Sequence, residues 1–374
     1  MAVTPDNLWT SLEFINPGTD ISKLIAPWTT TAGFPLVTAT LTNSKTVKLT
    51  QKRFLSKSKD HTDKSMYNVP VTVAIDSKAD YTKTTPIAMF TIAEGEAGKT
   101  LELPKAVEKY FIMNVQQTGF YRVNYDAENW ANISEALQMA DHDGIHVMNR
   151  AQIVDDLFNL AKVGIVEYRD VVDIISYLKT EKNYIPWLSA ITGLAGISPR
   201  ITEEHREVFN WYILDLMKNI YDHLTFDQKT NEPRTDIYNR NNVLAWACKY
   251  GHADCIAKSK EHFEAYKSKG TMVHPDLRSV VYCNGIRNGG DDEFTFLWNK
   301  IATSNVAAEI LNIHAGLACT RSAAKMTVYL DYVLASVRKQ DQSSAISSAI
   351  TSNPESVDMA YEYITKNFAA WTKA

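Results

Sequence analysis

The spacing of the apolar residues changes near Tyr125, and this change limits the fold more than any other feature of the chain. Before it, short runs rich in β-branched residues, such as VTATLT and NVPVTVAID, are bounded by Gly, Pro, Asp or Lys, as is typical of strands. After it, apolar residues recur with a helical period, as in NRAQIVDDLFNLAKVG, where Ile153, Leu157 and Ala161 fall on one stripe. We therefore expect a mainly α protein, with a small β-sandwich followed by an α-helical superhelix of HEAT-like helix pairs, an α-solenoid.

Turn and cap residues divide this pattern into parts. Asn43 and Ser44 interrupt a threonine-rich run and predict a hairpin turn. Asn149 is a candidate N-cap, and Gly164 a candidate C-terminal stop, for the helix between them. We predict a helical segment at 1–26, a β-sandwich domain at 27–122 and a helical domain at 123–374.

Composition excludes several classes of protein. The 374 residues are 45% hydrophobic and 22% charged, which is ordinary for a soluble globular protein. The formal net charge of −4 is spread along the chain without a basic block, so a nucleic-acid partner is not expected. No apolar run approaches the roughly 18 residues that a membrane span requires.

Three histidines are candidates for metal ligands, and the local sequence argues against that role for each. His142 and His146 are four residues apart, a spacing that brings two imidazoles to one face of a helix. Gly144 interrupts that segment, so we interpret it as an exposed loop. His314 lies on the apolar stripe of a predicted helix and is interpreted as a core residue.

A glycine-rich stretch near the middle of the helical region does not resemble a phosphate loop. Gly285, Gly289 and Gly290 follow a predicted helix, and three acidic residues come directly after them. Acidic residues suit the first turn of a helix and repel phosphate, so the structural interpretation is preferred.

The four cysteines leave two interpretations open. Cys248 and Cys255 bracket a predicted turn between helices, and Cys283 and Cys319 lie on predicted helices with one helix between them. Bridges within each pair would suit an exported protein, whereas four buried thiols would suit a cytosolic one. Spacing alone does not decide between them. Asn132 begins the only sequon that we consider a glycosylation candidate, Asn-Ile-Ser.

Several motifs, in order and spacing, resemble landmarks of the M1 zinc aminopeptidases of the aminopeptidase N group, including insect gut members. WTTTAGFPLVTATLT and TGFYRVNYDAENW are similar to the start and end of that family's β-domain. NRAQIVDDLFNLAKVG, HPDLRSVVYCNGIRNGGDDEF and VRKQD are similar to its helical C-terminal domain. The resemblance implies disulfides between Cys248 and Cys255 and between Cys283 and Cys319. It also implies a location on the extracellular face of the plasma membrane, with the parent protein anchored there.

The family's catalytic motifs do not accompany this match. The chain has no His-Glu dipeptide, and therefore no HExxH zinc helix, and it lacks the GxMEN motif. The resemblance thus implies a fragment without cofactor that is inactive by itself. It also implies that the 1–26 segment is the helical tail of a preceding, zinc-bearing catalytic domain and that the helical domain at 123–374 is truncated at its end. In the parent enzyme, which removes N-terminal residues from peptides, this part would cover the active site and line the peptide cavity.

Two sets of residues are candidates for roles within that fragment. Arg150, Arg278 and Arg287 are candidates for contacts with a peptide carboxylate, because guanidinium groups bind carboxylates in a bidentate manner. Asp155 and Asp156 resemble a catalytic pair, but their place on an amphipathic helix favours a solvated or ion-paired face.

The expected partners are the missing catalytic domain, peptides and, through the helical domain, a second copy of the chain. Resemblance to insect gut and mammalian members also suggests a bacterial toxin or a virus protein. Two alternative functions stay open at this point. One is a receptor or binding module for a toxin, virus or antibody, and the other is an unrelated helical scaffold.

Overall fold

A computed structural model describes the chain except residues 1–2, 59–61, 93–95, 140–141, 354 and 372–374. The chain divides into two compact units, Met1–Leu194 and Ala195–Ala374. The division falls inside helix α6 (Tyr184–Ile197). By this measure the first helices after the sheets group with the sheets and not with the later helices.

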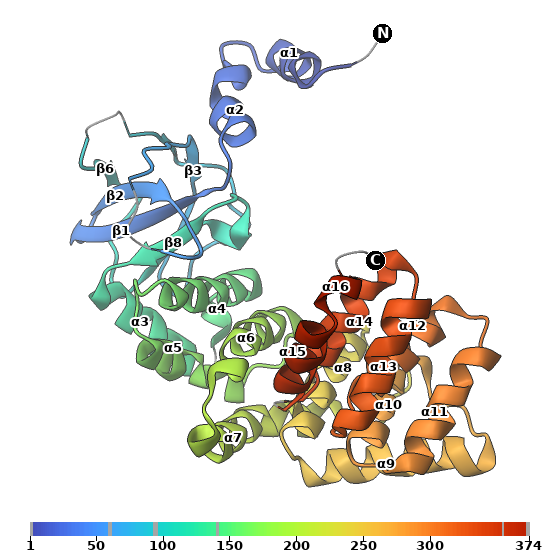
Figure 1. Cartoon of the computed structure of the whole chain (residues 1–374). Helices are drawn as coiled ribbons and strands as arrows, with labels where there is room; N and C mark the ends of the chain where they lie inside the picture. The colour runs from blue at the N-terminus through green and yellow to red at the C-terminus, as the bar shows by residue number, and fades with distance from the viewer. Residues whose placement is uncertain (1–2, 59–61, 93–95, 140–141, 354, 372–374) are drawn as a thin grey trace. The chain divides into compact units, whose positions relative to one another are not determined.

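Two helices precede the strands. They are α1 (Pro5–Ile15) and α2 (Ile21–Thr30) (Figure 1). Asp20 caps α2 by accepting a hydrogen bond from the Lys23 N–H at 2.9 Å. Because α2 continues to Thr30, it crosses the expected domain limit at residue 26.

The first unit contains a four-stranded sheet and two smaller ones. The larger sheet has the order β6-β2-β1-β8, with strands β1 (Pro35–Asn43), β2 (Thr46–Arg53), β6 (Lys99–Glu102) and β8 (Arg122–Tyr125). Strands β1 and β2 form an antiparallel hairpin whose connection follows Asn43, which confirms the predicted turn. β8 runs parallel to β1. The two-stranded sheets pair β3 (Val69–Val71) with β5 (Ala88–Phe90), and β4 (Val73–Ile75) with β7 (Phe111–Met113).

Alternation of side chains explains the core of the larger sheet. On β2, Val47, Leu49 and Gln51 point inward and are buried, whereas the residues between them are not. Gln51 is satisfied there because its amide exchanges hydrogen bonds with the backbone of Tyr67.

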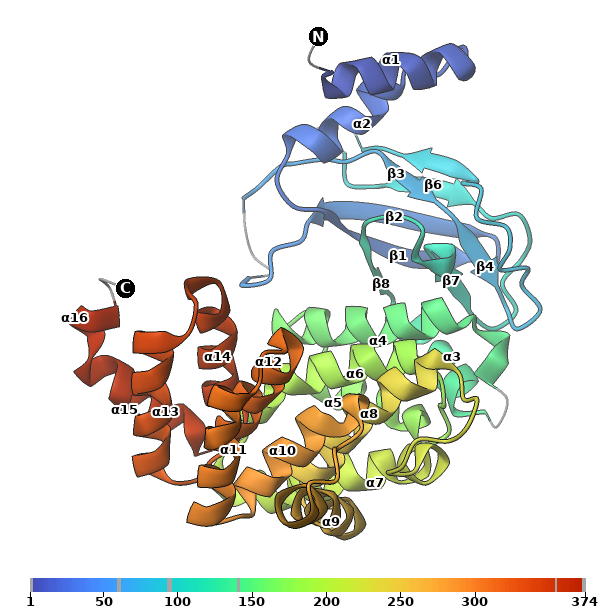
Figure 2. The same cartoon turned by 90° about the vertical axis from the view of Figure 1, so that its right-hand side faces the viewer.

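Four helices follow the sheets in the first unit: α3 (Ala127–Gln138), α4 (Val147–Lys162), α5 (Tyr168–Ile175) and α6. Helix α4 lies along β8 (Figure 2), and the predicted stripe on it is buried. Its end is confirmed, because Gly164 has a φ of 72° and donates a backbone hydrogen bond to Ala161.

The start of α4 was predicted wrongly. Its N-cap is His146, whose Nδ1 accepts from the Met148 N–H at 3.3 Å. Asn149 is instead fully buried inside the helix. Its side chain accepts from the Gln116 N–H at 2.8 Å and donates to the Asn114 carbonyl at 3.0 Å. Tertiary hydrogen bonds therefore use the polar group that the pattern assigned to a cap.

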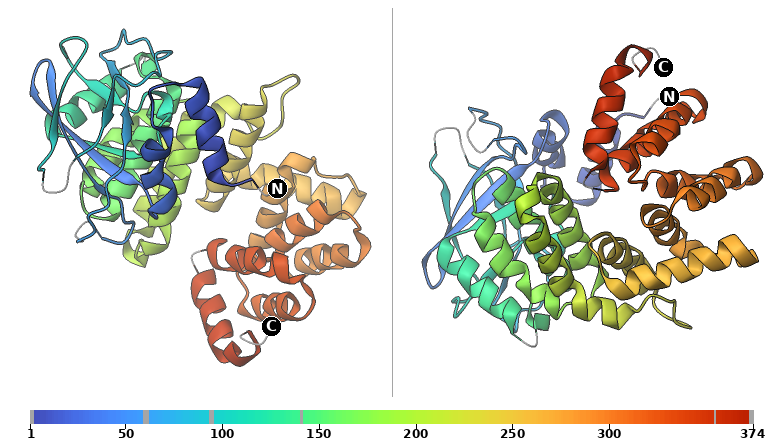
Figure 3. Two further views of the ribbon diagram at one scale, coloured as in Figure 1. Left: turned by 90° about the horizontal axis from the view of Figure 1, so that it is seen from above. Right: turned by 60° about the horizontal axis from the view of Figure 1, so that its bottom comes forward.

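The second unit is helical in its described residues. Its α-helices are α7 (Arg206–Leu224), α8 (Arg234–Lys249), α9 (Ala253–Lys269), α10 (Arg278–Arg287), α11 (Asp291–Thr303), α12 (Ala307–Leu317), α13 (Ala323–Ser336), α14 (Lys339–Thr351), α15 (Ser356–Lys366) and α16 (Phe368–Trp371). Helices close in sequence pack on one another, for example α7 on α8, α9 on α10 and α14 on α15 (Figure 3). The expected fold class, a small sheet part followed by a helical array, is confirmed. None of the described helices combines the length and apolar character needed to cross a membrane.

Candidate functional site

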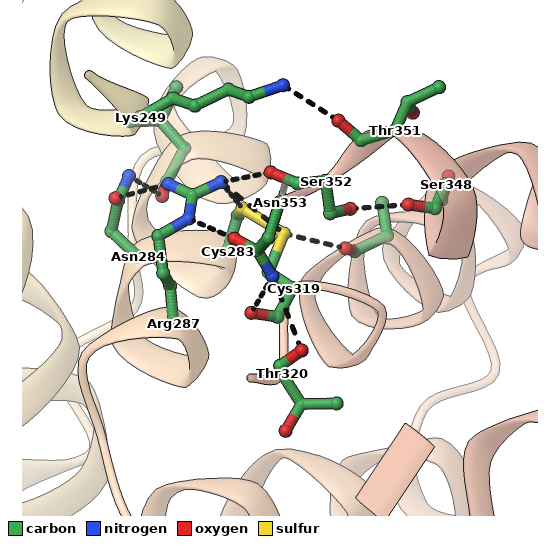
Figure 4. The surroundings of a disulfide bond; sticks show 12 residues. Lys249, Cys283, Asn284, Arg287, Cys319, Thr320, Ser348, Thr351, Ser352 and Asn353 are labelled. Atoms are coloured by element: carbon green, nitrogen blue, oxygen red, sulfur yellow. Dashed lines mark hydrogen bonds between the residues drawn. A yellow bond between two sulfur atoms is a disulfide. The ribbon is translucent and has the colours of Figure 1, made fainter. Parts of the chain in front are cut away.

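The second unit contains a cavity of about 760 Å³. The residues that matter for its chemistry come from the ends of helices α8, α10 and α14 and from the disulfide bond that joins α10 to the segment after α12 (Ala307–Leu317). They are Lys249, Cys283, Arg287, Cys319 and Asn353 (Figure 4). Tyr250, which follows Lys249, also lines the cavity. The ends of helices carry unpaired backbone groups, so polar side chains gather there.

Arg287 is the central charged group of this cavity. Its Nε donates to Asn353 Oδ1 at 2.7 Å and its Nη1 to Asn284 Oδ1 at 2.8 Å. Its Nη2 donates to the Ser352 carbonyl at 3.1 Å and to Cys283 Sγ at 3.0 Å. Every one of these acceptors is uncharged. The described residues provide no ion pair to this guanidinium, although only 7% of the residue is exposed.

Asn353 helps to position Arg287 and connects it to the disulfide. Its own Nδ2 donates to the Cys319 carbonyl at 2.8 Å, which connects it to the disulfide. Burial, together with the nearby Arg321, lowers the pKa of Arg287 to about 10, so the group stays charged at neutral pH. The cavity therefore holds a rigid positive charge that no described carboxylate neutralises by direct contact.

Lys249, the last residue of α8, adds a second cation. Its Nζ donates to the Thr351 carbonyl at 2.8 Å and lies 5.7 Å from the centre of the Tyr250 ring. Burial lowers the pKa of Lys249 to about 8, and repulsion from Arg287 and Arg206 acts in the same direction. Sequence analysis missed Lys249 and Asn353, because nothing in the local pattern connects them with Arg287.

Both expected disulfides are present. Cys248 is joined to Cys255 across the turn between α8 and α9, and Cys283 of α10 is joined to Cys319 just after α12. The paired Cα atoms are 5.2 Å apart in each bridge, inside the normal range. The second bridge lines the cavity beside Arg287. No cysteine is left as a free thiol.

The other two predicted arginines lie outside the cavity and bind carboxylates of the chain itself. Arg150 is 2% exposed, and its Nε donates to Glu181 Oε2 at 2.6 Å. Arg278 forms an ion pair with the buried Glu309. Of the three arginine candidates, only Arg287 lines this cavity.

The interpretation of His142 as part of an exposed loop is wrong. His142 is 8% exposed, because it packs against Tyr177 and its Nε2 lies 3.6 Å from Glu181 Oε2. His146 is half-buried as the cap of α4. His314 is a core residue as predicted, with its Nε2 3.3 Å from the Tyr332 hydroxyl. Within the described part of the chain, no three His, Cys, Asp or Glu residues are arranged to hold a metal ion.

The aspartate pair of α4 is ion-paired, as one of the two interpretations held. Arg122 Nη1 lies 2.6 Å from Asp155 and 2.9 Å from Asp156. Asp156 is not solvated, since it is 3% exposed and accepts from the Val123 N–H at 3.0 Å. This burial raises the pKa of Asp156 to about 7, against the attraction of Arg122.

The glycines and the sequon have structural surroundings. An added Cβ at Gly285 would lie 2.3 Å from the Phe263 ring. Gly290 caps α11, where its N–H donates to Glu293 at 2.7 Å. These contacts support the structural interpretation of the stretch. Asn132 is half-buried on α3 and donates to the Lys109 carbonyl at 2.7 Å; use of its sequon stays a prediction.

Comparison with known proteins identifies the class. Residues 110–374 match the ERAP1-like C-terminal domain. The chain belongs to this family and represents the C-terminal part of an M1 aminopeptidase, which excludes an unrelated helical scaffold. It is 31% identical to aminopeptidase N of Plutella xylostella, over 98% of this chain and 40% of that protein. It is 30% identical to membrane alanyl aminopeptidase of Manduca sexta, over 94% of this chain and 36% of that protein, and 30% identical to human aminopeptidase N, over 97% and 38%. The chain thus spans less than half the length of these curated relatives.

Proposed function

We propose that this chain is the non-catalytic C-terminal part of a membrane-anchored zinc aminopeptidase that removes N-terminal residues from peptides. Its place in the intact enzyme is over the active site, where its helical unit lines the peptide cavity. The observation that carries this proposal is the family match together with relatives that are named aminopeptidases.

The residues of this chain do not fit a catalytic zinc ion. A zinc peptidase site needs three protein ligands around an open position, and the described residues offer no such group. The HExxH motif is also missing from the whole sequence. We therefore assign no catalytic step to these residues, and their role is to bind and enclose the peptide.

A measurement on the isolated chain tests whether zinc binding and catalysis belong to another part of the enzyme. We expect the purified protein, after exposure to zinc and dialysis, to retain no stoichiometric zinc and to release no product from alanyl p-nitroanilide. A longer form that includes the preceding catalytic part should do both. Stoichiometric zinc with turnover in the isolated chain would overturn the proposal.

Within this function, Arg287 is the group we assign to a peptide carboxylate, since it is the arginine candidate that lines the cavity and has no ion pair with a carboxylate of the described residues. In the longer enzyme, Arg287→Gln should raise the KM for a peptide with a free C-terminus and leave the KM for its C-terminal amide unchanged. Arg169→Gln is the control, because Arg169 is exposed on α5. Equal effects on the acid and the amide would remove Arg287 from substrate binding.

A further inference from the structure

The cavity beside the Cys283–Cys319 bridge places a primary amine next to a guanidinium. Lys249 and Arg287 donate to the carbonyls of the consecutive residues Thr351 and Ser352 (Figure 4). Consecutive Cα atoms are about 3.8 Å apart, so the two cationic groups lie within reach of one small ligand. We infer that this cavity is a carbonyl-capture site, in which Lys249 forms an imine with aldehydes or 2-oxo acids whose carboxylate or phosphate is bound by Arg287.

The charges around the cavity favour an anionic ligand. Of the acidic groups nearby, Glu355 pairs with Arg321 at 3.0 Å, and Asp358 lies at the exposed rim. Arg206 pairs with Glu203 at 2.9 Å. In the described part of the chain, neither Lys249 nor Arg287 forms an ion pair with a carboxylate, although the charge of Glu355 attracts both without direct contact. A buried cation without a counter-ion is costly, so an anion that enters the cavity relieves a penalty already present in the fold.

The same surroundings make Lys249 a nucleophile. A lysine that is desolvated or placed beside another cation is a familiar activated amine. With its pKa lowered to about 8 by burial and by Arg287 and Arg206, about a fifth of the amine is neutral near pH 7.4, against about a thousandth for an exposed lysine. Tyr250, the other titratable group against Lys249, has its pKa raised by burial and stays neutral in this range.

The reaction needs no further reagent. The neutral Lys249 nitrogen attacks the carbonyl carbon, the C–N bond forms, and the carbonyl oxygen takes up the proton that the nitrogen loses. The nitrogen then gives up its second proton as the C=N bond forms, the C–O bond breaks, and the hydroxyl leaves with that proton as water. One amine and one carbonyl compound thus give one imine and one water. Arg287 does not react; it holds the anionic group so that the carbonyl carbon lies near the nitrogen.

Pyridoxal 5′-phosphate is a suitable probe, because it carries an aldehyde and a phosphate. We expect borohydride trapping at pH 7.4, followed by peptide mass mapping, to label Lys249 at least tenfold faster than other lysines of the chain. Labelling should be lost in Lys249→Arg and unchanged in the control Lys260→Arg, which alters an exposed lysine of α9. Uniform labelling of the lysines would overturn the inference.

Two further arms test the role of Arg287. Pyridoxal, which lacks the phosphate, should label Lys249 about tenfold more slowly than the phosphate ester, and Arg287→Gln should remove that preference while Arg287→Lys keeps most of it. Should the glutamine variant fail to fold, competition replaces it: inorganic phosphate should slow labelling of the unaltered protein by pyridoxal 5′-phosphate. Equal rates with both aldehydes, or no competition, would contradict the assignment. None of these results depends on aminopeptidase activity, so they stand or fall separately from the proposed function.

Discussion

At the scale of single residues, the interior of this protein holds charges of two kinds. Arg150 and Arg240 are buried with carboxylate partners, Glu181 and Glu232 respectively. Within the described residues, Arg287 is buried and donates its hydrogen bonds to neutral acceptors. Burying a charge without a partner is unfavourable in free energy. The paired arginines are therefore explained by their contribution to stability, whereas Arg287 is suited to bind an anionic ligand.

The Arg150–Glu181 pair allows a direct test of how much a buried, paired arginine contributes to stability. Arg150→Met leaves Glu181 buried at 1% exposure without its strongest partner, and we expect the free energy of unfolding to fall by about 3 kcal/mol. Arg169→Met is the matched control, because its pair with Asp173 is exposed and 3.9 Å long, so a change below about 0.5 kcal/mol is expected. Urea unfolding of both variants measures the two changes in the free energy of unfolding. Equal losses of stability in the two variants would contradict a special cost of leaving Glu181 buried without Arg150.

Asp156 predicts a dependence of stability on pH. Burial raises its pKa to about 7 in the folded protein, from the ordinary value of 3.8 that applies to the unfolded chain. Between these two pH values the native state therefore binds a proton that the unfolded chain does not bind. The stabilisation contributed by Asp156 is therefore complete at low pH and is lost as pH rises through about 7.

The substitution Asp156→Asn exposes this dependence because it removes the titration. We compare the unaltered protein with the Asn variant through the ratio of their unfolding equilibrium constants. From about pH 5 to about pH 8 this ratio should shift in favour of the variant by roughly a hundredfold, because between about pH 5 and about pH 7 only the native state holds the proton. Asp155→Asn, at a more exposed site, should show a smaller shift. A difference that does not vary with pH would argue against a raised pKa.

At the scale of elements, the helical unit depends on close approach between neighbouring helices. Gly285 of α10 faces the Phe263 ring of α9, and an added Cβ at Gly316 of α12 would lie 2.7 Å from Tyr282 Cβ of α10. Small residues at these crossings let α10 lie between its two neighbours without a gap.

Alanine substitutions at two helical glycines separate packing from helix propensity. Gly285→Ala should destabilise the protein by about 1–3 kcal/mol, because the new methyl group overlaps the Phe263 ring. At Gly196 of α6 no atom lies within 4 Å of an added Cβ, so Gly196→Ala should stabilise by about 0.5–1 kcal/mol. Thermal unfolding followed by circular dichroism measures both changes in stability. If the two substitutions changed stability in the same direction, packing around the glycine would not determine the effect.

The two disulfides are expected to differ in their contribution to stability. Their sequence separations are 36 for Cys283–Cys319 and 7 for Cys248–Cys255. In the chain-entropy model the longer loop stabilises more, by about 1.5 kcal/mol. Paired Cys→Ser variants, compared by denaturant unfolding, should show this order. A larger loss from the short loop would mean that local contacts, not chain entropy, dominate.

At the scale of the whole molecule, the state of the cysteines reports on the environment for which the chain is built. Protein from an oxidising expression route should show no free thiol in denaturant and four after reduction, as its four cysteines require. Titration with a chromogenic disulfide reagent measures this directly. Free thiols before reduction would contradict the pairing and favour a reducing compartment.

Much of the fold follows from short-range patterns. The hairpin after Asn43, the buried stripe of α4 and its end at Gly164 could be predicted because turn residues and helical period act over a few positions. The start of α4 could not, because the polar side chain of Asn149 found tertiary partners on Asn114 and Gln116 and left the cap to His146. His142 was misplaced for the same reason, since its burial depends on Tyr177 and Glu181.

The sequence by itself therefore determined the order of strands and helices, the family, and the absence of a zinc helix from this chain. Only the tertiary structure decided which charged residues are neutralised and which are not. Arg287 and its partner Asn353 are 66 residues apart, and Lys249 lies on a third helix. Their meeting depends on how α8, α10 and α14 pack, and packing between helices distant in sequence has no local signature. That is why three arginines looked alike in the sequence, while the fold leaves Arg287 alone among them without a described carboxylate partner.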